Sequence, residues 1–320
     1  MQAVPDDIKK LTQLSTLRLM GNKLKTLPDS LSDLTSLVNL DITKNSFTEL
    51  PEVIEKMTWL KDFQANWNRI EKIPSKFSHL KNLTYLDLSI NALSSLPKEL
   101  GNMKAMTSLD LSNNRFHEFP ACVTEMTSLI TLNLSSNKIE KIPAEISNLK
   151  SISKLDLRNN RIKKLVPELG KLGNMTSLYL QKNEIEEFSD DVSSLQQLRE
   201  INISDNLIKS VSPKAFSGMS SLKSLLAWRN RIETLPDEVF LGLSSLTDLD
   251  FTNNYLKEFP SSLETLETLG MLRLGSNVLT SIPKMPKKIV IIFLYYFYII
   301  LFYYFSIDFY FGNCFFACLI

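Results

Sequence analysis

Asparagine recurs along this chain at an almost constant interval. It stands at Asn22, Asn45, Asn68, Asn91, Asn114, Asn137, Asn160, Asn183, Asn206, Asn230, Asn254 and Asn277. The interval is 23 residues except for two intervals of 24 residues. A period of this length predicts a solenoid, in which each repeat forms one coil that stacks on its neighbours.

Each repeat carries the same apolar frame around its asparagine. The fourth repeat reads Leu83, Leu86, Leu88, Asn91, Leu93, Leu96, Pro97, Leu100 and Met103. Two leucines separated by one polar residue predict a short, half-buried strand. The Leu-Pro step turns the chain, and the spacing of three after it predicts a 3₁₀ turn or short helix. We therefore expect an α/β solenoid with a parallel sheet on its concave face and 3₁₀ or helical segments on its convex face.

The motif LxxLxLxxNxLxxLPxxLxxLxx resembles that of the leucine-rich-repeat family, from about Val4 to Pro283. Its 23-residue LPxxL form is similar to the intracellular class, which includes the Ras suppressor protein, Scribble-type scaffolds and the repeats of Roco proteins. The resemblance implies that the twelve asparagines form a structural ladder of hydrogen bonds between coils. Val166 and Ser189 stand where the seventh and eighth repeats would have proline, and two later repeats have the longer form common in extracellular members. We expect only local changes of curvature there.

The composition changes abruptly after Lys288. Residues 1–288 are predicted to form the repeat domain, with about 12 repeats and incomplete at both ends, whereas residues 289–320 form a hydrophobic tail with one charge, Asp308. The uncharged stretch from Ile289 to Ile307 is long enough for a membrane span that would leave the repeats in the cytosol. Nine of its nineteen residues are Phe or Tyr, which equally fits a translated non-coding segment. Both interpretations of the tail stay open.

Nothing in the sequence predicts catalysis. The net charge of +1 gives no reason to expect a nucleic-acid partner. His79 and His117 lack neighbours at metal-ligand spacing, and no phosphate-binding loop or nucleophile elbow is present. Cys122 is predicted to be a small buried residue. With three cysteines and no signal peptide, we predict a cytosolic protein that is not an enzyme and has no metal or cofactor.

The outward residues of the predicted strands form the candidate binding surface. The position between the two strand leucines is acidic in the central repeats, and a mostly basic column follows the asparagines, which suits a protein partner of mixed charge. Exposed Trp, Tyr and Arg dominate interface energetics. The predicted contact residues are Tyr179, Leu226, Trp228, Arg229 and Arg231 in one cluster, Trp67, Arg69 and Tyr85 in a second, and Asp87, Asp110, Asp156 and Arg158 along the strands. Alternatively, each tryptophan fills the space beside the small residue Ala65 or Ala227.

These features favour a non-catalytic scaffold or adaptor that binds a protein on its concave face in intracellular signalling. The resemblance suggests a small GTPase or another signalling protein as partner. We expect an association with a membrane only if the tail is a genuine membrane span. One alternative is the partner-sensing arm of a larger signalling enzyme, a kinase, cyclase or phosphatase, whose catalytic domain lies outside this chain. A membrane-anchored receptor is a further alternative.

Overall fold

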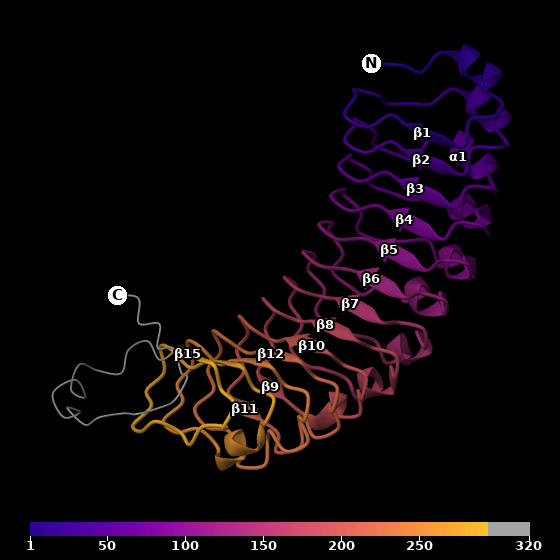
Figure 1. The fold of residues 1–320 in the computed structure, drawn as a ribbon. Coiled ribbons are helices and arrows are strands. Elements are labelled where there is room, and N and C mark those ends of the chain that lie inside the picture. The colour runs from indigo at the N-terminus through magenta and orange to yellow at the C-terminus, as the bar shows by residue number, and fades with distance from the viewer. Residues whose placement is uncertain (294–320) are drawn as a thin grey trace. The chain divides into compact units, whose positions relative to one another are not determined.

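The computed structural model describes residues 1–293 and divides the chain into two compact units. Unit 1 comprises Met1–Asn160, and unit 2 begins at Arg161. We number the coils by their asparagines, so that Asn22 lies in coil 1 and Asn277 in coil 12. Each unit is a stack of such coils (Figure 1).

One short strand per coil builds the sheet of unit 1. The strands are β1 (Thr16–Arg18), β2 (Asn39–Asp41), β3 (Asp62–Gln64), β4 (Tyr85–Asp87), β5 (Ser108–Asp110), β6 (Thr131–Asn133) and β7 (Lys154–Asp156). Consecutive strands pair in parallel and in strict repeat register, as in Leu86 opposite Leu109. The central residue of β2 to β7 is buried, and its neighbours are more exposed, except for Asp156 at the end of β7. The predicted alternation is therefore confirmed, and the outward side is called the sheet face below.

The return half of each coil is a single turn of helix. In unit 1 these turns are η1 (Asp6–Lys10), η2 (Asp29–Asp33), α1 (Val53–Lys56), η3 (Ser75–His79), η4 (Lys98–Asn102), η5 (Ala121–Glu125) and η6 (Ala144–Asn148). Proline precedes most of them in an extended conformation, for example Pro97 with φ −67° and ψ 142°. Proline fixes φ and ends strand pairing, which is why the chain turns back at this step. The predicted solenoid of strands and 3₁₀ turns is confirmed.

Unit 2 repeats this arrangement with some variation. Its main sheet contains β8 (Ser177–Tyr179), β10 (Glu200–Asn202), β12 (Ser224–Leu226), β13 (Asp248–Asp250), β14 (Met271–Arg273) and β15 (Ile291–Phe293). Its helical turns are η7 (Pro167–Lys171), η8 (Asp190–Val192) and η9 (Ser261–Thr265). A second sheet, which the sequence did not predict, pairs β9 (Glu187–Phe188) with β11 (Ser210–Val211).

Of the four irregular repeats, coils 9 and 10 change the structure of their return half. Val166 and Ser189, which stand where the frame has proline, both adopt the extended conformation that proline has elsewhere. The longer coils 9 and 10 return through turns at residues 213–218 and 237–242 instead of through 3₁₀ helices. Phe216 and Phe240 are completely buried in these turns. The added residue is thus accommodated by a change in the return half, while the strands keep their pairing.

The residue before each ladder asparagine has a left-handed backbone. In coils 2 to 12 its φ lies between 51° and 62°. The residues are Lys44, Trp67, Ile90, Asn113, Ser136, Asn159, Lys182, Asp205, Arg229, Asn253 and Ser276. This conformation costs a residue with a Cβ about 1–2 kcal/mol, and asparagine tolerates it best. The asparagine that follows this position donates within its own coil, as Asn91 Nδ2 does to Leu88 O at 3.0 Å.

Candidate functional site

From coil 2 onward, the ladder asparagine joins its coil to the one before it. The Nδ2 of Asn114, in coil 5, donates to the carbonyl of Leu88 in coil 4 at 2.9 Å. It also donates to Leu111 at 3.1 Å and Ser112 at 3.2 Å within its own coil. Its Oδ1 accepts the Leu93 N–H of coil 4 at 3.0 Å. Asn114 is only 8% exposed, so this side chain serves the fold and offers almost nothing to a partner.

The aspartates of the acidic column on the sheet face of unit 1 also stabilise backbone turns by accepting hydrogen bonds. Asp87 Oδ1 accepts the backbone N–H two residues later at 2.9 Å, and Asp110 does the same at 2.8 Å. Asp110 Oδ2 accepts a further bond from Asn133 Nδ2 at 2.9 Å. Asp156 is only 3% exposed and forms a 3.0 Å ion pair with Arg158, which is itself exposed. Sequence reasoning missed this structural role, which the strand-terminating position of each aspartate signals.

Burial and neighbouring charges disfavour ionisation on this face. Burial raises the pKa of Asp87, and the nearby Asp110 and Asp41 raise it further against the hydrogen bonds from Ser89, which lower it. Burial likewise raises the pKa of Tyr85, with Asp87 and Asp110 adding to the effect. The pKa values of Asp87 and Tyr85 are therefore raised first by burial and then by neighbouring carboxylates.

Trp67 lies at the turn that follows β3. Its side chain is 54% exposed, whereas Ala65 is completely buried. The ring therefore does not fill the space beside Ala65. Arg69 is exposed two residues later, and Tyr85 is half-buried on β4. These three residues occupy neighbouring coils on the outward side of unit 1.

In unit 2 the structure brings three of the predicted contact residues together. Leu226 at the end of β12 and Trp228 just beyond it are both half-buried. The guanidinium of Arg229 lies 5.4 Å from the centroid of the Trp228 ring, within the range of a cation–π contact. It also lies 3.7 Å from a carboxylate oxygen of Asp205.

The other two predicted residues of this cluster lie apart. Tyr179 is on β8, and β10 separates it from the strand of Leu226. Its hydroxyl donates to Glu200 Oε2 at 2.7 Å, so it is bonded within unit 2. Arg231 is exposed on the chain that follows the ladder asparagine.

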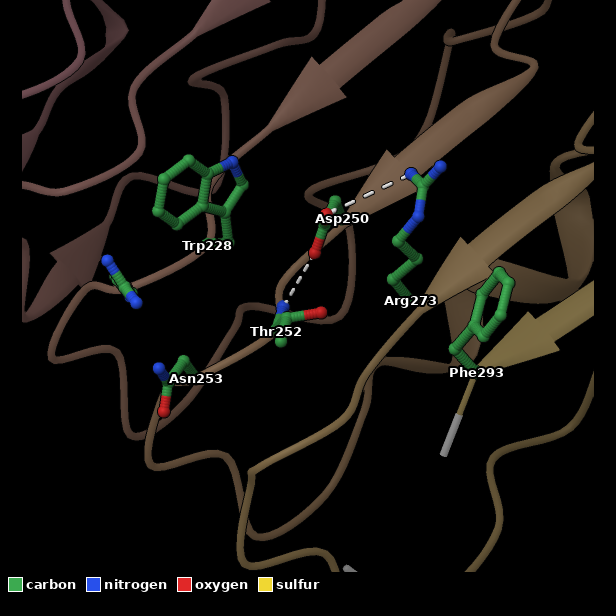
Figure 2. A pocket seen from close by; sticks show the side chains of 7 residues that line it. Trp228, Asp250, Thr252, Asn253, Arg273 and Phe293 are labelled. Atoms are coloured by element: carbon green, nitrogen blue, oxygen red, sulfur yellow. Dashed lines mark hydrogen bonds and ion pairs between the residues drawn. The ribbon is translucent and has the colours of Figure 1, made fainter. Parts of the chain in front are cut away.

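A hollow of about 480 Å³ opens on the sheet face of unit 2 beside Trp228. It is lined by Trp228, Arg229, Asp250, Thr252, Asn253, Arg273 and Phe293. Figure 2 shows Trp228 and Phe293 on opposite sides of this hollow, with Asp250 and Arg273 between them. The hollow spans the coils that contribute β12 to β15.

The arginines of the hollow are paired with carboxylates, most closely with ones just outside its lining. Arg273 Nη1 lies 2.6 Å from Asp248 Oδ1 and 3.9 Å from Asp250 Oδ2. Its guanidinium also lies 5.9 Å from the centroid of the Phe293 ring. Asp250 Oδ1 accepts the Thr252 N–H at 2.9 Å. Each arginine of the hollow therefore has both a carboxylate and an aromatic ring beside it, and the two rings form its apolar walls.

Five residues of the hollow were absent from the predicted contact set. Asp250 and Arg273 occupy the same strand column as Leu226. Their position in that column could therefore have identified them from the sequence. Phe293 was assigned to the hydrophobic tail. However, the spacing of Ile289 and Ile292 repeats the LxxL step of the frame, and β15 pairs with β14. The rest of the predicted span, from residue 294 onward, lies outside the described residues.

Residues 1–293 contain no cluster of His, Cys, Asp and Glu that could hold a metal ion. Burial raises the pKa of Cys122 to about 11, so this thiol is poorly suited to act as a nucleophile. None of the helices in this range combines the length and apolar character that a bilayer crossing requires.

Short parallel strands, 3₁₀ returns and an asparagine ladder define a leucine-rich-repeat architecture. A family model described as leucine rich repeat matches residues 66–116, 120–162, 173–232 and 222–279, more than half of the chain. The protein belongs to the leucine-rich-repeat family. Members of this family are generally non-catalytic interaction modules. No curated protein sequence matches the chain significantly.

Solved structures share the fold. A leucine-rich-repeat protein of Leptospira interrogans is 27% identical with a TM-score of 0.74, and the match covers 88% of this chain and 77% of that one. An internalin, InlF, of Listeria monocytogenes is 25% identical with a TM-score of 0.66, over 83% and 82%. The functional domain of InlJ from the same organism is 25% identical with a TM-score of 0.73, over 91% and 60%. These likenesses support the family and leave the intracellular class of the repeats a prediction.

Proposed function

We propose that this protein is a non-catalytic scaffold or adaptor that holds a protein partner on the sheet face of unit 2. The observation that carries the proposal is the hollow between Trp228 and Phe293. Tryptophan and arginine at a concave site are the residue types that contribute most to protein interfaces. The family as a whole commonly mediates protein–protein interaction, which agrees with this assignment.

The pairing of charges in the hollow indicates what enters it. Arg273 and Arg229 each already have an acidic neighbour, so a polyanion would have to displace those carboxylates. An apolar or aromatic side chain instead gains contact with both rings and breaks no ion pair. We therefore propose that an apolar anchor residue of a protein occupies the hollow.

We further propose that the protein acts in the cytosol, in signalling. The scarcity of cysteine and the LPxxL form of the repeats favour this compartment. A small GTPase or another signalling protein is the class of partner that the same repeat form favours.

Site-specific photocrosslinking in a cytosolic extract tests the proposal. A benzophenone amino acid at Thr252, inside the hollow, should give a protein adduct upon irradiation. The same probe at Lys214, an exposed residue in a return turn of unit 2, should not give that adduct. Trp228→Ala should remove the adduct at Thr252. Equal adducts at both positions, or an adduct at Thr252 that survives Trp228→Ala, would refute the hollow as the docking site.

A further inference from the structure

Two bulky apolar side chains stand at left-handed turn positions of unit 1. Trp67 has φ 54° and Ile90 has φ 53°, whereas the next coil has Asn113 at this position. Asparagine tolerates a left-handed backbone, but an indole or a β-branched side chain is strained there. Folding alone would therefore favour another residue at both positions.

The hydrogen-bond ladder prevents the backbone from relaxing. The Trp67 N–H donates to Ser89 O at 3.1 Å, and the Ile90 N–H donates to Ser112 O at 2.9 Å. The Asn68 N–H donates to Ile90 O at 3.2 Å, which fixes the two turns side by side. Trp67 is 54% exposed and Ile90 is half-buried, so neither residue is held at its position by burial in the core.

Three chemically distinct bands cross this part of unit 1. On the strand side, Asp87 and Asp110 lie opposite each other in register, and neither takes part in an ion pair within residues 1–293. Trp67 and Ile90 form the middle band. On the far side, Arg69 and an arginine two coils later, Arg115, are exposed just after their ladder asparagines. From the strand side to the far side, the surface therefore carries an acidic band, an apolar band and a basic band.

We propose that this banded surface binds an extended segment of a protein in which a basic, an apolar and an acidic side chain alternate. Side chains on one side of an extended chain recur about every 7 Å, so three alternate residues of one segment can face three successive bands. The basic side chain meets Asp87 and Asp110, the apolar one packs on Trp67 and Ile90, and the acidic one meets Arg69. A polyanion would be repelled by the carboxylates and a polycation by the arginines.

Fluorine NMR of the full chain labelled with 5-fluorotryptophan tests this proposal. The chain has three tryptophans, which report separately. Trp67 reports on the bands, Trp228 on the hollow of unit 2, and Trp59, whose Nε1 donates to Leu34 O at 3.1 Å, is a reference. The probe is the peptide acetyl-Arg-Ala-Phe-Ala-Glu-amide. Two control peptides have the same length. In one both charged residues are Arg, and in the other both are Glu.

We expect saturable movement of the Trp67 resonance alone, with about threefold tighter binding of the mixed peptide than of either control. An unmoved Trp67 resonance, or equal affinities for the three peptides, overturns the proposal. Movement of Trp228 alone also overturns it, because the peptide would then occupy the hollow. Failure here leaves the photocrosslinking result in unit 2 unaffected, so the two proposals are separable.

The variant Ile90→Asn gives a second test. We expect it to stay folded, because asparagine suits this backbone, and to weaken binding of the mixed peptide at least threefold. Lys44→Asn is the matched control, since Lys44 has φ 55° at the same position of coil 2 and contributes no apolar surface. It should leave the affinity unchanged. Parent-like affinity in Ile90→Asn overturns the proposal, and Ile90→Gly repeats the test should the asparagine variant fold poorly.

Discussion

Replacement of one ladder asparagine should separate two coils locally. Asn114→Ala removes the only acceptor that residues 1–293 offer to the Leu93 N–H. It also removes one of the two asparagine donors to each of the carbonyls of Leu88 and Leu111. These three residues are completely buried, so water does not replace the lost bonds. An unsatisfied buried amide costs about 1–3 kcal/mol, and each lost carbonyl bond about 1 kcal/mol. We therefore expect a loss of about 3 kcal/mol in the stability of coils 4 and 5.

Amide hydrogen exchange measures this loss coil by coil, which matters because a long repeat array need not unfold in one step. A loss of about 3 kcal/mol corresponds to roughly a hundredfold faster exchange at Leu93. Asn22→Ala is the matched control. Asn22 is half-buried, its Oδ1 faces the N-terminal amine, and its amide reaches only carbonyls of its own coil. Its replacement should cost about 1 kcal/mol or less. Equal effects of the two substitutions would refute the reasoning.

Three further outcomes follow from the structure. Because the pKa of Asp87 is raised in the folded state, its stabilising contribution is present below the unfolded value of 3.8 and is lost as pH rises through the folded pKa. Asp87→Asn should therefore raise the urea midpoint at pH 7 and leave it nearly unchanged at pH 3, and a lower midpoint at pH 7 would contradict this. Cys122 should react with iodoacetamide only after denaturation, as followed by peptide mass spectrometry, and rapid labelling of the native protein would be inconsistent with its raised pKa of about 11. Gly218→Ala places a Cβ against the Ser193 carbonyl oxygen, closer than real Cβ contacts allow, and should lower stability by about 1–3 kcal/mol in thermal unfolding. Gly173→Ala, with open space around it, should not.

The sequence predicted the coil and its period because both follow from apolar spacing. Leu86 and Leu109 occupy the register that a 23-residue repeat requires, and the Leu-Pro step turns the chain where it was expected. The sheet of β9 and β11 could not be predicted. Phe188 and Val211 occupy the frame position of Leu96, which predicts burial but not strand pairing. Serine follows each of them where the frame has proline.

The candidate site was predicted only in part, because the sequence gives the column of a side chain and not its pairing. Trp228 and Arg229 were found from residue type. Residue type predicts the acidic column as a contact surface, but Asp156 is almost completely buried and accepts the Arg158 N–H of its own turn. Phe293 was missed because the apolar composition after Lys288 concealed one further strand of the same frame.

The direction of the ladder bonds has a mechanical consequence. Within each unit an asparagine secures the loop of the preceding coil, as Asn45 does for the Leu24 N–H and Asn114 for the Leu93 N–H. When a pulling force removes a later coil, it therefore takes away the acceptor that protected the loop before it. Such a chain would unravel under tension in small sequential steps from its later end, each step weakening the next.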